Sequence, residues 1–211
     1  MSNAPSCSAW RLYVIVDRSA AKGRDLARIA QQAIRGGADV IQFRDKAALA
    51  GSLAEEGERL LKVTRAAGVP LIINDRVDVA AAIGADGVHL GREDLPVEAA
   101  RRILGPGKLL GKSTHSLQQA LAADREAIDY LAVGPIYPTP TKPDYPDVGP
   151  ALIGQVASQV AHPVVTIGGI DERTLPEVIA AGARCAAVVR AVCAADDPEA
   201  AARRLKRAFV L

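Results

Sequence analysis

The stretch VIQFRDKAALAGSLAEEGERLLKVTRAAGVPLIIND, residues 40–75, contains the unit that decides the fold. It opens with a short apolar run at 40–45 and closes with a second one at 71–75. Between them, residues 50–67 are rich in Ala, Leu, Glu and Arg, a composition typical of a helix. Short, nearly continuous apolar runs are typical of strands that are buried on both faces and therefore parallel. The stretch predicts a strand–helix–strand unit.

The same unit recurs along the whole chain. Apolar, β-branched runs predict eight strands, at 12–17, 40–45, 71–75, 87–90, 109–113, 130–135, 164–169 and 186–190. The segments between and after them predict eight helices, at 24–36, 50–67, 76–84, 96–104, 116–125, 150–160, 172–181 and 197–209. Eight alternating units in 211 residues fit a closed (β/α)8 TIM barrel of the α/β class better than an open doubly wound sheet. We expect an N-terminal tail at 1–10 and a single barrel domain at 11–211.

Composition and charge exclude several classes of function. The 26 Lys and Arg residues against 24 Asp and Glu give a net charge of +2, so we expect no nucleic-acid partner. The longest apolar runs have the length of strands, so no membrane association is expected, and the N-terminus lacks the features of a secretory signal. Cys7, Cys185 and Cys193 match neither a disulfide framework nor a zinc site, which favours a reducing, cytoplasmic location. The sequence leaves open whether the chain forms a homo-oligomer.

Polar residues stand at the predicted strand ends, where (β/α)8 barrels place their active sites. After the second strand, Gln42, Arg44 and Lys46 occupy alternate positions and therefore share one face, as candidate ligands for an anion. The alternative is an exposed strand end in which Arg44 pairs with Asp45 or with a helix carboxylate.

Two carboxylates follow the next two strands. Asp75 comes after Asn74, and Asp94 lies in the segment that follows His89. Such a pair suits Mg2+, which takes one or two protein carboxylates and fills its remaining positions with water and phosphate oxygens. The alternative is that each carboxylate caps the helix that follows it. We expect His89 to be a satisfied core residue.

The segment PIYPTPTKPDYPDVG, residues 135–149, is predicted as a loop because it contains five prolines. Long loops in compact domains are usually functional, and this one carries two hydroxyls and one ammonium at Thr139-Pro140-Thr141-Lys142. Gly168-Gly169 and Val189-Arg190 end the last two strands, where this fold often binds phosphate. Ser113 and His115 end the fifth strand, and His115 is interpreted as structural. Two anion centres indicate a reaction on two phosphorylated small molecules, or on one diphosphorylated molecule.

Six motifs follow one another in a familiar order: QFRDK (42–46), IND (73–75), GVHLGRED (87–94), GKSTH (111–115), GPIYPTPTKPD (134–144) and IGGI (167–170). With them the chain resembles the thiamine-phosphate synthase family over about residues 11–209. The resemblance implies a (β/α)8 barrel that joins hydroxymethylpyrimidine diphosphate to a thiazole ethyl phosphate or its carboxylated tautomer. Thiamine phosphate and diphosphate would be the products of an Mg2+-assisted, dissociative displacement.

The resemblance also implies the role of each matching residue. The pyrimidine diphosphate would be bound by Gln42, Phe43, Arg44, Asp45, Lys46, Asn74, Ser113 and Lys142, with Lys142, Arg44 and Ser113 as catalytic residues. The thiazole phosphate would be bound by Thr139, Pro140, Thr141, Gly169, Val189 and Arg190, and Mg2+ by Asp75 and Asp94. Arg190 departs from the family pattern, which usually has Ser there.

Two alternative functions stay open beside the synthase. One is a thiazole tautomerase-like isomerase, and the other is a non-catalytic, regulatory ligand-binding barrel. The presence of Asp75, Asp94 and Lys142 favours the synthase, because tautomerases tend to lack the acidic pair and the intact threonine–lysine loop.

Overall fold

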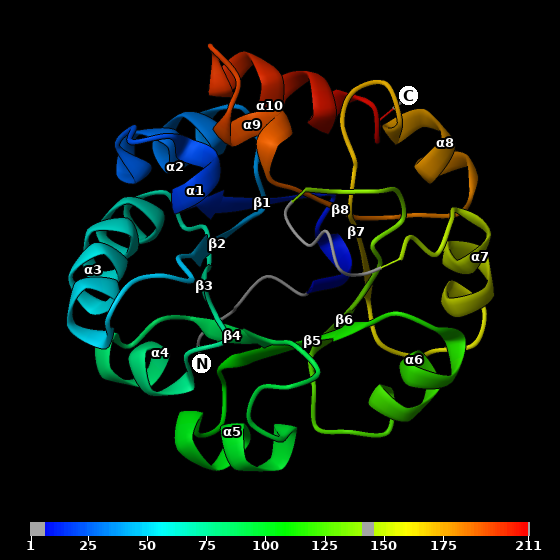
Figure 1. The fold of residues 1–211 in the computed structure, drawn as a ribbon, viewed down its shortest axis with the longest axis horizontal. Coiled ribbons are helices and arrows are strands. Elements are labelled where there is room, and N and C mark those ends of the chain that lie inside the picture. Colours follow the sequence, from blue (N-terminus) through cyan, green and yellow to red (C-terminus); the bar gives the residue numbers. More distant parts are fainter. Residues whose placement is uncertain (1–6, 141–145, 211) are drawn as a thin grey trace.

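The computed structural model describes residues 7–140 and 146–210. Among these residues, parallel strands pair in chain order, and the last strand pairs with the first, so the sheet closes into a barrel surrounded by helices (Figure 1). The strands are β1 (Leu12–Asp17), β2 (Val40–Arg44), β3 (Leu71–Asn74), β4 (Gly87–Leu90), β5 (Leu109–Thr114), β6 (Tyr130–Val133), β7 (Val164–Ile167) and β8 (Ala186–Val188). The predicted (β/α)8 architecture is confirmed.

The predicted helices are also confirmed, with ends that differ by a few residues. They are α2 (Leu26–Arg35), α3 (Ala50–Ala66), α4 (Val77–Ile83), α5 (Val97–Leu104), α6 (Leu117–Ala123), α7 (Ala151–Ala157), α8 (Leu175–Ala180) and α10 (Pro198–Arg207). The Ser116 and Asp197 side chains accept backbone N–H bonds in the first turns of α6 and α10, as their positions before these helices predict. Three short helices lie outside the prediction, because each has too few residues to show a periodicity: η1 (Cys7–Ala9), α1 (Arg18–Ala21) and α9 (Arg190–Cys193).

The core has two layers, which the alternation of side chains along each strand separates. In β2 and β3, Ile41, Phe43, Leu71 and Ile73 belong to the layer between the sheet and the helices. A second cluster fills the inside of the barrel, with Cys7, Trp10, Tyr13, Ile15, Val40, Ile72, Tyr130, Ala132, Val165, Cys185 and Ala187. The outer layer holds the helices on the sheet, and the inner layer forms the floor beneath the barrel mouth.

Residues 7–10, which lie within the expected tail, are part of this inner layer. Trp10 is 2% exposed, and its ring meets Tyr13 and Tyr130 edge-on at centroid distances of 5.9 and 5.3 Å. Edge-to-face aromatic pairs at such distances are favourable. The N-terminal end of the barrel is therefore filled by these aromatic side chains. The boundary between tail and barrel stays a prediction.

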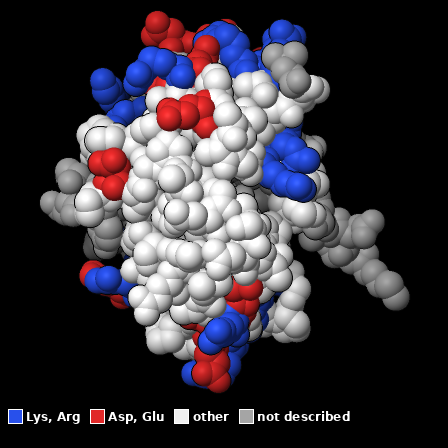
Figure 2. Space-filling view, turned by 90° about the vertical axis from the view of Figure 1, so that its right-hand side faces the viewer, with Lys and Arg blue, Asp and Glu red and all other residues white. Residues whose placement is uncertain are grey.

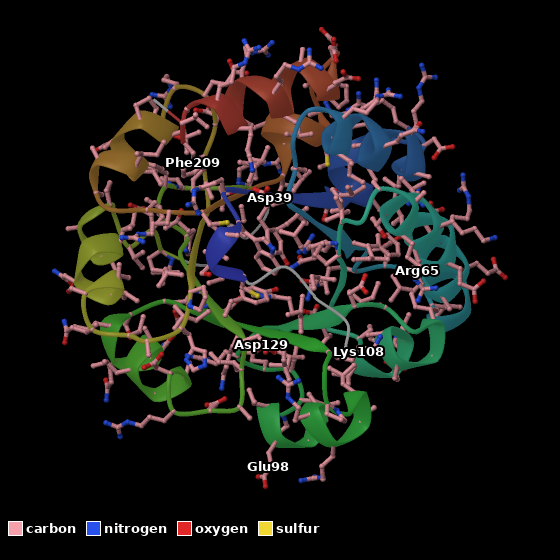
Figure 3. The ribbon with its side chains drawn as sticks, turned by 180° about the vertical axis from the view of Figure 1, so that it is seen from behind. Asp39, Arg65, Glu98, Lys108, Asp129 and Phe209 are labelled. Carbon is pink, nitrogen blue, oxygen red and sulfur yellow. The ribbon has the colours of Figure 1, made fainter. Side chains whose placement is uncertain are left out.

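Three aspartates, Asp39, Asp86 and Asp129, link neighbouring strands at the N-terminal end of the barrel; Asp39 and Asp129 are labelled in Figure 3. Each directly precedes an even-numbered strand and accepts the N–H of a residue at the start of the strand before it. The bonds run from Leu12 to Asp39, from Leu71 to Asp86 and from Leu110 to Asp129, each with an N···O distance of 2.8 Å. A carboxylate that accepts a backbone N–H in this way stabilises the fold, since the donor would otherwise be left unpaired.

The side of the molecule formed by α6, α7 and α8 carries few charged side chains at its centre (Figure 2). The sequence of α7, ALIGQVA, contains no charged residue. An uncharged surface of small residues does not identify a partner, so a homo-oligomer stays a prediction. Within residues 7–140 and 146–210, no helix combines the length and the apolar character needed to cross a membrane.

Candidate active site

A cavity opens at the C-terminal end of the barrel, and every strand contributes to its lining. The predicted site residues that line it are Gln42, Arg44, Asn74, Ser113, Thr139, Gly169 and Val189. The closed barrel brings these residues together from β2, β3, β5, the loop after β6, and the ends of β7 and β8. The position of the site is therefore the one that the fold predicts.

Arg44 is held in this cavity by a residue that the sequence analysis does not single out. Its guanidinium forms an ion pair with Asp17, which lies opposite Arg44 in the register between β1 and β2. The Arg44 side chain is 14% exposed and that of Asp17 is 4% exposed, so the pair is largely shielded from water. Asp17 also accepts the N–H of Ala20 at 2.8 Å. This carboxylate fixes the orientation of the arginine at the cavity wall.

Of the QFRDK motif, Gln42 and Arg44 line the cavity, whereas Phe43, Asp45 and Lys46 do not. Phe43 is 1% exposed and packs between the sheet and the helices, because side chains alternate along β2. Asp45 accepts the N–H groups of Ala47 and Ala48, at 3.0 and 3.1 Å, and lies 3.6 Å from the guanidinium of Arg18. Arg44 pairs with Asp17 and not with Asp45, the alternative that the sequence left open, and neither Phe43 nor Asp45 is part of the cavity lining.

The two metal-ligand candidates lie close together beside β3 and β4. The Asp94 carboxylate is near enough to that of Asp75 for a hydrogen bond, and it accepts the N–H of Gly91 at 2.6 Å. The ammonium of Lys46 pairs with Asp75. Burial raises the pKa of Asp94, and the neighbouring Asp75 adds to this, while the Gly91 N–H and the Lys46 charge act in the opposite direction. Two facing carboxylates favour the binding of a cation.

The alternative interpretation of Asp75 and Asp94 as helix caps is wrong. The N-cap positions of α4 and α5 are Arg76 and Pro96, and neither helix has a side-chain cap. Asp75 also has a φ of +63°, a left-handed conformation that costs energy for a residue with a Cβ. Instead of capping the helix, this carboxylate pairs with the Lys46 ammonium and lies beside Asp94.

Gly168 and Gly169 let the proline-rich loop pack against the end of β7. A Cβ on Gly168 would lie 2.4 Å from the Cα of Pro135, and one on Gly169 would lie 2.6 Å from the Cβ of Tyr137. Ile136 and Tyr137 donate their N–H groups to Ile167 and Gly168, at 2.9 and 3.0 Å. The φ values of Gly168 and Gly169, +104° and +66°, also favour glycine at both positions. The glycine pair thus fixes the start of the loop that brings Thr139 to the cavity.

The other predicted phosphate ligands differ in their position relative to the cavity. Val189 lines the cavity, whereas the side chain of Arg190, the first residue of α9, is exposed and is not part of the lining. Pro140 is exposed. Thr141 and Lys142 lie outside the described residues.

The floor of the cavity contains polar residues that the sequence analysis does not place in the site. Tyr13, His89 and Tyr130 line the cavity together with Gln42 and Ser113. His89 is hydrogen-bonded on both ring nitrogens, as expected of a satisfied residue, but it faces the site. His115, interpreted as structural, also lines the cavity, and its ring nitrogen Nδ1 is bonded to the carbonyl of Gly134. A search for alternate polar positions in β1 and β6 would have found the two tyrosines.

Fold and site together define a class, a (β/α)8-barrel enzyme with its active site at the C-terminal ends of the strands. The chain matches the thiamine monophosphate synthase family over residues 12–192. It is 50% identical over 198 residues to the thiamine-phosphate synthase of Chloroflexus aurantiacus, which covers 93% of this chain and 91% of that protein. The corresponding protein of Mycobacterium sp. (strain KMS) is 48% identical over 220 residues, 98% of this chain and 95% of that one.

Solved structures agree with this relationship. The thiamine phosphate pyrophosphorylase from Pyrococcus furiosus superposes with a TM-score of 0.88 at 36% identity, over 97% of both chains. A 3-hexulose-6-phosphate synthase, at 19% identity and a TM-score of 0.67, shares the fold. The chain belongs to the thiamine monophosphate synthase family, and its function is that of a thiamine-phosphate synthase, a transferase of thiamine biosynthesis.

Proposed function

We propose that the cavity holds hydroxymethylpyrimidine diphosphate at the β2–β4 side and a thiazole ethyl phosphate at the β6–β8 side. The observation that carries this proposal is the separation of two kinds of anion-binding group across one mouth. Arg44 lines the cavity on the β2 side, and the Lys46–Asp75 ion pair, with Asp94 beside it, follows β2, β3 and β4 at the same end of the barrel. Thr139, Gly169 and Val189 lie on the other. Two anchored phosphates would hold the two reactants in line, which supplies much of the rate enhancement of a bimolecular reaction.

The acidic pair fits the proposed cofactor, Mg2+. No group of three or more His, Cys, Asp or Glu side chains that could hold a metal is found in the described part of the chain. A two-carboxylate site suits Mg2+, which completes its octahedron with water and substrate phosphate oxygens, and disfavours metals that need a full protein cage. Asp75 and Asp94 would hold the ion, and Asn74 lies next to them in sequence. When bound, the ion neutralises charge on the leaving diphosphate.

The cationic side chains act on the same leaving group. In a dissociative displacement, the bond between the pyrimidine methylene carbon and the diphosphate oxygen breaks first, and its electron pair leaves with the diphosphate. Arg44 and Lys46 would stabilise that negative charge, and Lys142 is proposed to do the same. Arg44 is already oriented by Asp17, so it needs no reorganisation during the reaction. The thiazole nitrogen then forms the new bond to the methylene carbon.

This mechanism requires no protein nucleophile, and the cysteines support that view. All three are buried, and none lines the cavity. Burial raises the pKa of Cys7 and of Cys193 to about 12, so neither thiol forms a thiolate at neutral pH. Free, protonated thiols also support the proposed cytoplasmic location.

A coupled assay tests the proposal. The protein is mixed with both substrates and Mg2+, and diphosphate release is measured beside thiamine phosphate formation, with and without EDTA. We expect both products in equal amounts and neither in EDTA. Diphosphate without thiamine phosphate would contradict the proposed thiazole site. Isomerisation of the carboxylated thiazole without metal would instead support a tautomerase.

A further inference from the structure

A chain of hydrogen bonds crosses the floor of the cavity and joins Gln42 to Ser113. Gln42 Nε2 donates to the Tyr13 hydroxyl at 2.7 Å, and this hydroxyl lies 3.0 Å from that of Tyr130. The Tyr130 hydroxyl lies 3.1 Å from His89 Nδ1, and His89 Nε2 lies 2.9 Å from Ser113 Oγ. The five side chains come from β2, β1, β6, β4 and β5. The chain thus connects a residue of the proposed diphosphate side with a residue of the proposed pyrimidine side.

The barrel leaves space for this chain at one position in particular. A Cβ on Gly111, in β5, would lie 2.1 Å from Cζ and 2.4 Å from the hydroxyl of Tyr130, and 2.5 Å from Nδ1 of His89. The Tyr130 and His89 rings stack at a centroid distance of 5.6 Å. The contact between the hydroxyl and the ring nitrogen therefore occupies the volume that a side chain at residue 111 would fill.

The direction of hydrogen-bond donation along this series follows from its first member, Gln42. Tyr13 accepts from the Gln42 amide, so its own proton is left for Tyr130. Burial raises the pKa of both tyrosines, so each hydroxyl carries one proton at neutral pH. Tyr130 then donates to His89 Nδ1, and a neutral His89 carries its proton on Nε2 and donates to Ser113 Oγ. With its oxygen accepting from His89, Ser113 turns its own proton toward the cavity.

We propose that Tyr13 is a positioning residue for the reaction, which fixes the Nε2–H tautomer of His89 and thereby makes Ser113 a hydrogen-bond donor to the pyrimidine ring. This inference rests on the proposed roles of Gln42 and Ser113. An aminopyrimidine offers ring nitrogens as acceptors, and a serine whose proton is fixed toward the cavity selects for such an acceptor. The alternative chain direction would make Ser113 donate to His89 and present only lone pairs to the substrate.

The test is Tyr13→Phe, which removes one hydroxyl and keeps the ring that packs on Trp10 and Tyr130. Long-range proton–nitrogen NMR spectra of histidine-labelled free protein report the tautomer, because protonated and unprotonated ring nitrogens resonate far apart. The protein has three histidines. The variants His115→Asn and His162→Asn identify the signals of the other two, so that those of His89 are assigned. We expect the Nε2–H form of His89 in the unaltered protein and a mixture of both tautomers in the variant.

Kinetics provide the second measurement on the same variant. Loss of one positioned hydrogen bond is expected to lower kcat roughly tenfold. The KM for the thiazole phosphate should stay within about twofold, since Tyr13 lies on the floor and not at the phosphate side. Unaltered His89 signals in Y13F, or altered signals with an unchanged kcat, would each overturn the proposal. A lower kcat with unaltered signals would show that Tyr13 acts through packing alone, which also overturns it.

Gly111→Ala disrupts the chain at a second point without removing any polar group. It is matched by Gly51→Ala, where a Cβ meets nothing within 4 Å. We expect G111A to disturb the His89 tautomer and to lower kcat at least as much as Y13F, and G51A to do neither. If G111A keeps the tautomer and the activity of the unaltered protein, the chain has no positioning role. The NMR comparison uses free protein, so it remains decisive even if the coupled assay contradicts the proposed reaction.

Discussion

The two ends of the barrel use aspartate in opposite ways. At the N-terminal end, Asp39, Asp86 and Asp129 each accept a backbone N–H from the start of a neighbouring strand. Asp39 and Asp129 also pair with a lysine and an arginine, respectively. At the C-terminal end, Asp75 and Asp94 face each other, and the pKa of Asp94 is raised by burial and by that neighbour. Both ends pair carboxylates with N–H groups or cations, but the C-terminal end also places two carboxylates side by side.

From this difference we expect the N-terminal aspartates to contribute stability and the C-terminal pair to contribute function. A carboxylate that accepts N–H bonds and pairs with a cation is stabilised in its charged form, and the fold gains from it. A pair of facing carboxylates costs the fold free energy, which the Lys46 charge offsets in part and a bound metal ion would offset further. Such a cost persists only where it is useful, which is the expectation for a metal site.

The largest effect should come from removing a carboxylate at the C-terminal end. We expect Asp94→Ala to lower kcat by more than about a hundredfold at millimolar Mg2+, because the diphosphate leaves without its metal. The coupled assay of diphosphate and thiamine phosphate measures this. Asp196→Ala, at an exposed position, is the matched control. Unchanged turnover in D94A would remove Asp94 from the metal site.

A carboxylate at the N-terminal end should show the reverse behaviour. Asp39 accepts the N–H groups of Arg11 and Leu12, at 2.7 and 2.8 Å, and pairs with Lys206 of α10. Its replacement by alanine leaves two donors unpaired, so we expect a loss of about 1–3 kcal/mol in the free energy of unfolding. Urea denaturation measures the loss. A kcat that also falls strongly in D39A would mean that the two ends are not separate in function.

The fold was predictable because its signals are local, whereas the site was predictable only in part. Apolar runs and helix starts such as Ser116 and Asp197 depend on neighbours in sequence. The strand-end rule likewise found Gln42, Arg44 and Asn74. The Tyr13–Tyr130 contact joins residues 117 positions apart, and only the closed barrel brings them together. The same holds for Asp17, which orients Arg44 across the β1–β2 register.

The side chains of the QFRDK motif do not all face the cavity. The resemblance implies that the whole QFRDK motif binds the diphosphate, but side chains alternate along β2 and the motif extends beyond the end of this strand. Phe43 therefore faces the helices, and Asp45 turns back onto its own loop. Gln42 lies 2% exposed on the floor, bonded to Tyr13, below Arg44 rather than beside it. Spacing predicts which residues share a face, but not how deep each one lies.

A smaller effect, on Tm, should distinguish the electrostatic cost of the Asp94 charge from the role of Asp94 in metal binding. The raised pKa of Asp94 means that its ionised form destabilises the folded state, and this cost appears as pH rises through the shifted pKa. We expect Asp94→Asn to raise Tm slightly at pH 7 in EDTA, with the gain vanishing toward acidic pH. Added Mg2+ should raise the Tm of the unaltered protein and not that of D94N. Calorimetry measures both. An equal response to Mg2+ in the two proteins would place the ion elsewhere.

The smallest effect is expected at Arg190. The side chain is exposed and is not part of the cavity lining, while the preceding Val189 lines the cavity. A phosphate contact at this position would therefore come from the backbone, which any side chain leaves in place. We expect Arg190→Ser to keep kcat and the KM for the thiazole phosphate within about twofold. Asp94→Ala, measured in the same assay, shows that the assay can detect a loss. A large rise in that KM would show that the guanidinium reaches the phosphate once substrate is bound, and that the β8 end of the mouth binds its anion through a side chain, as we propose for the β2 end.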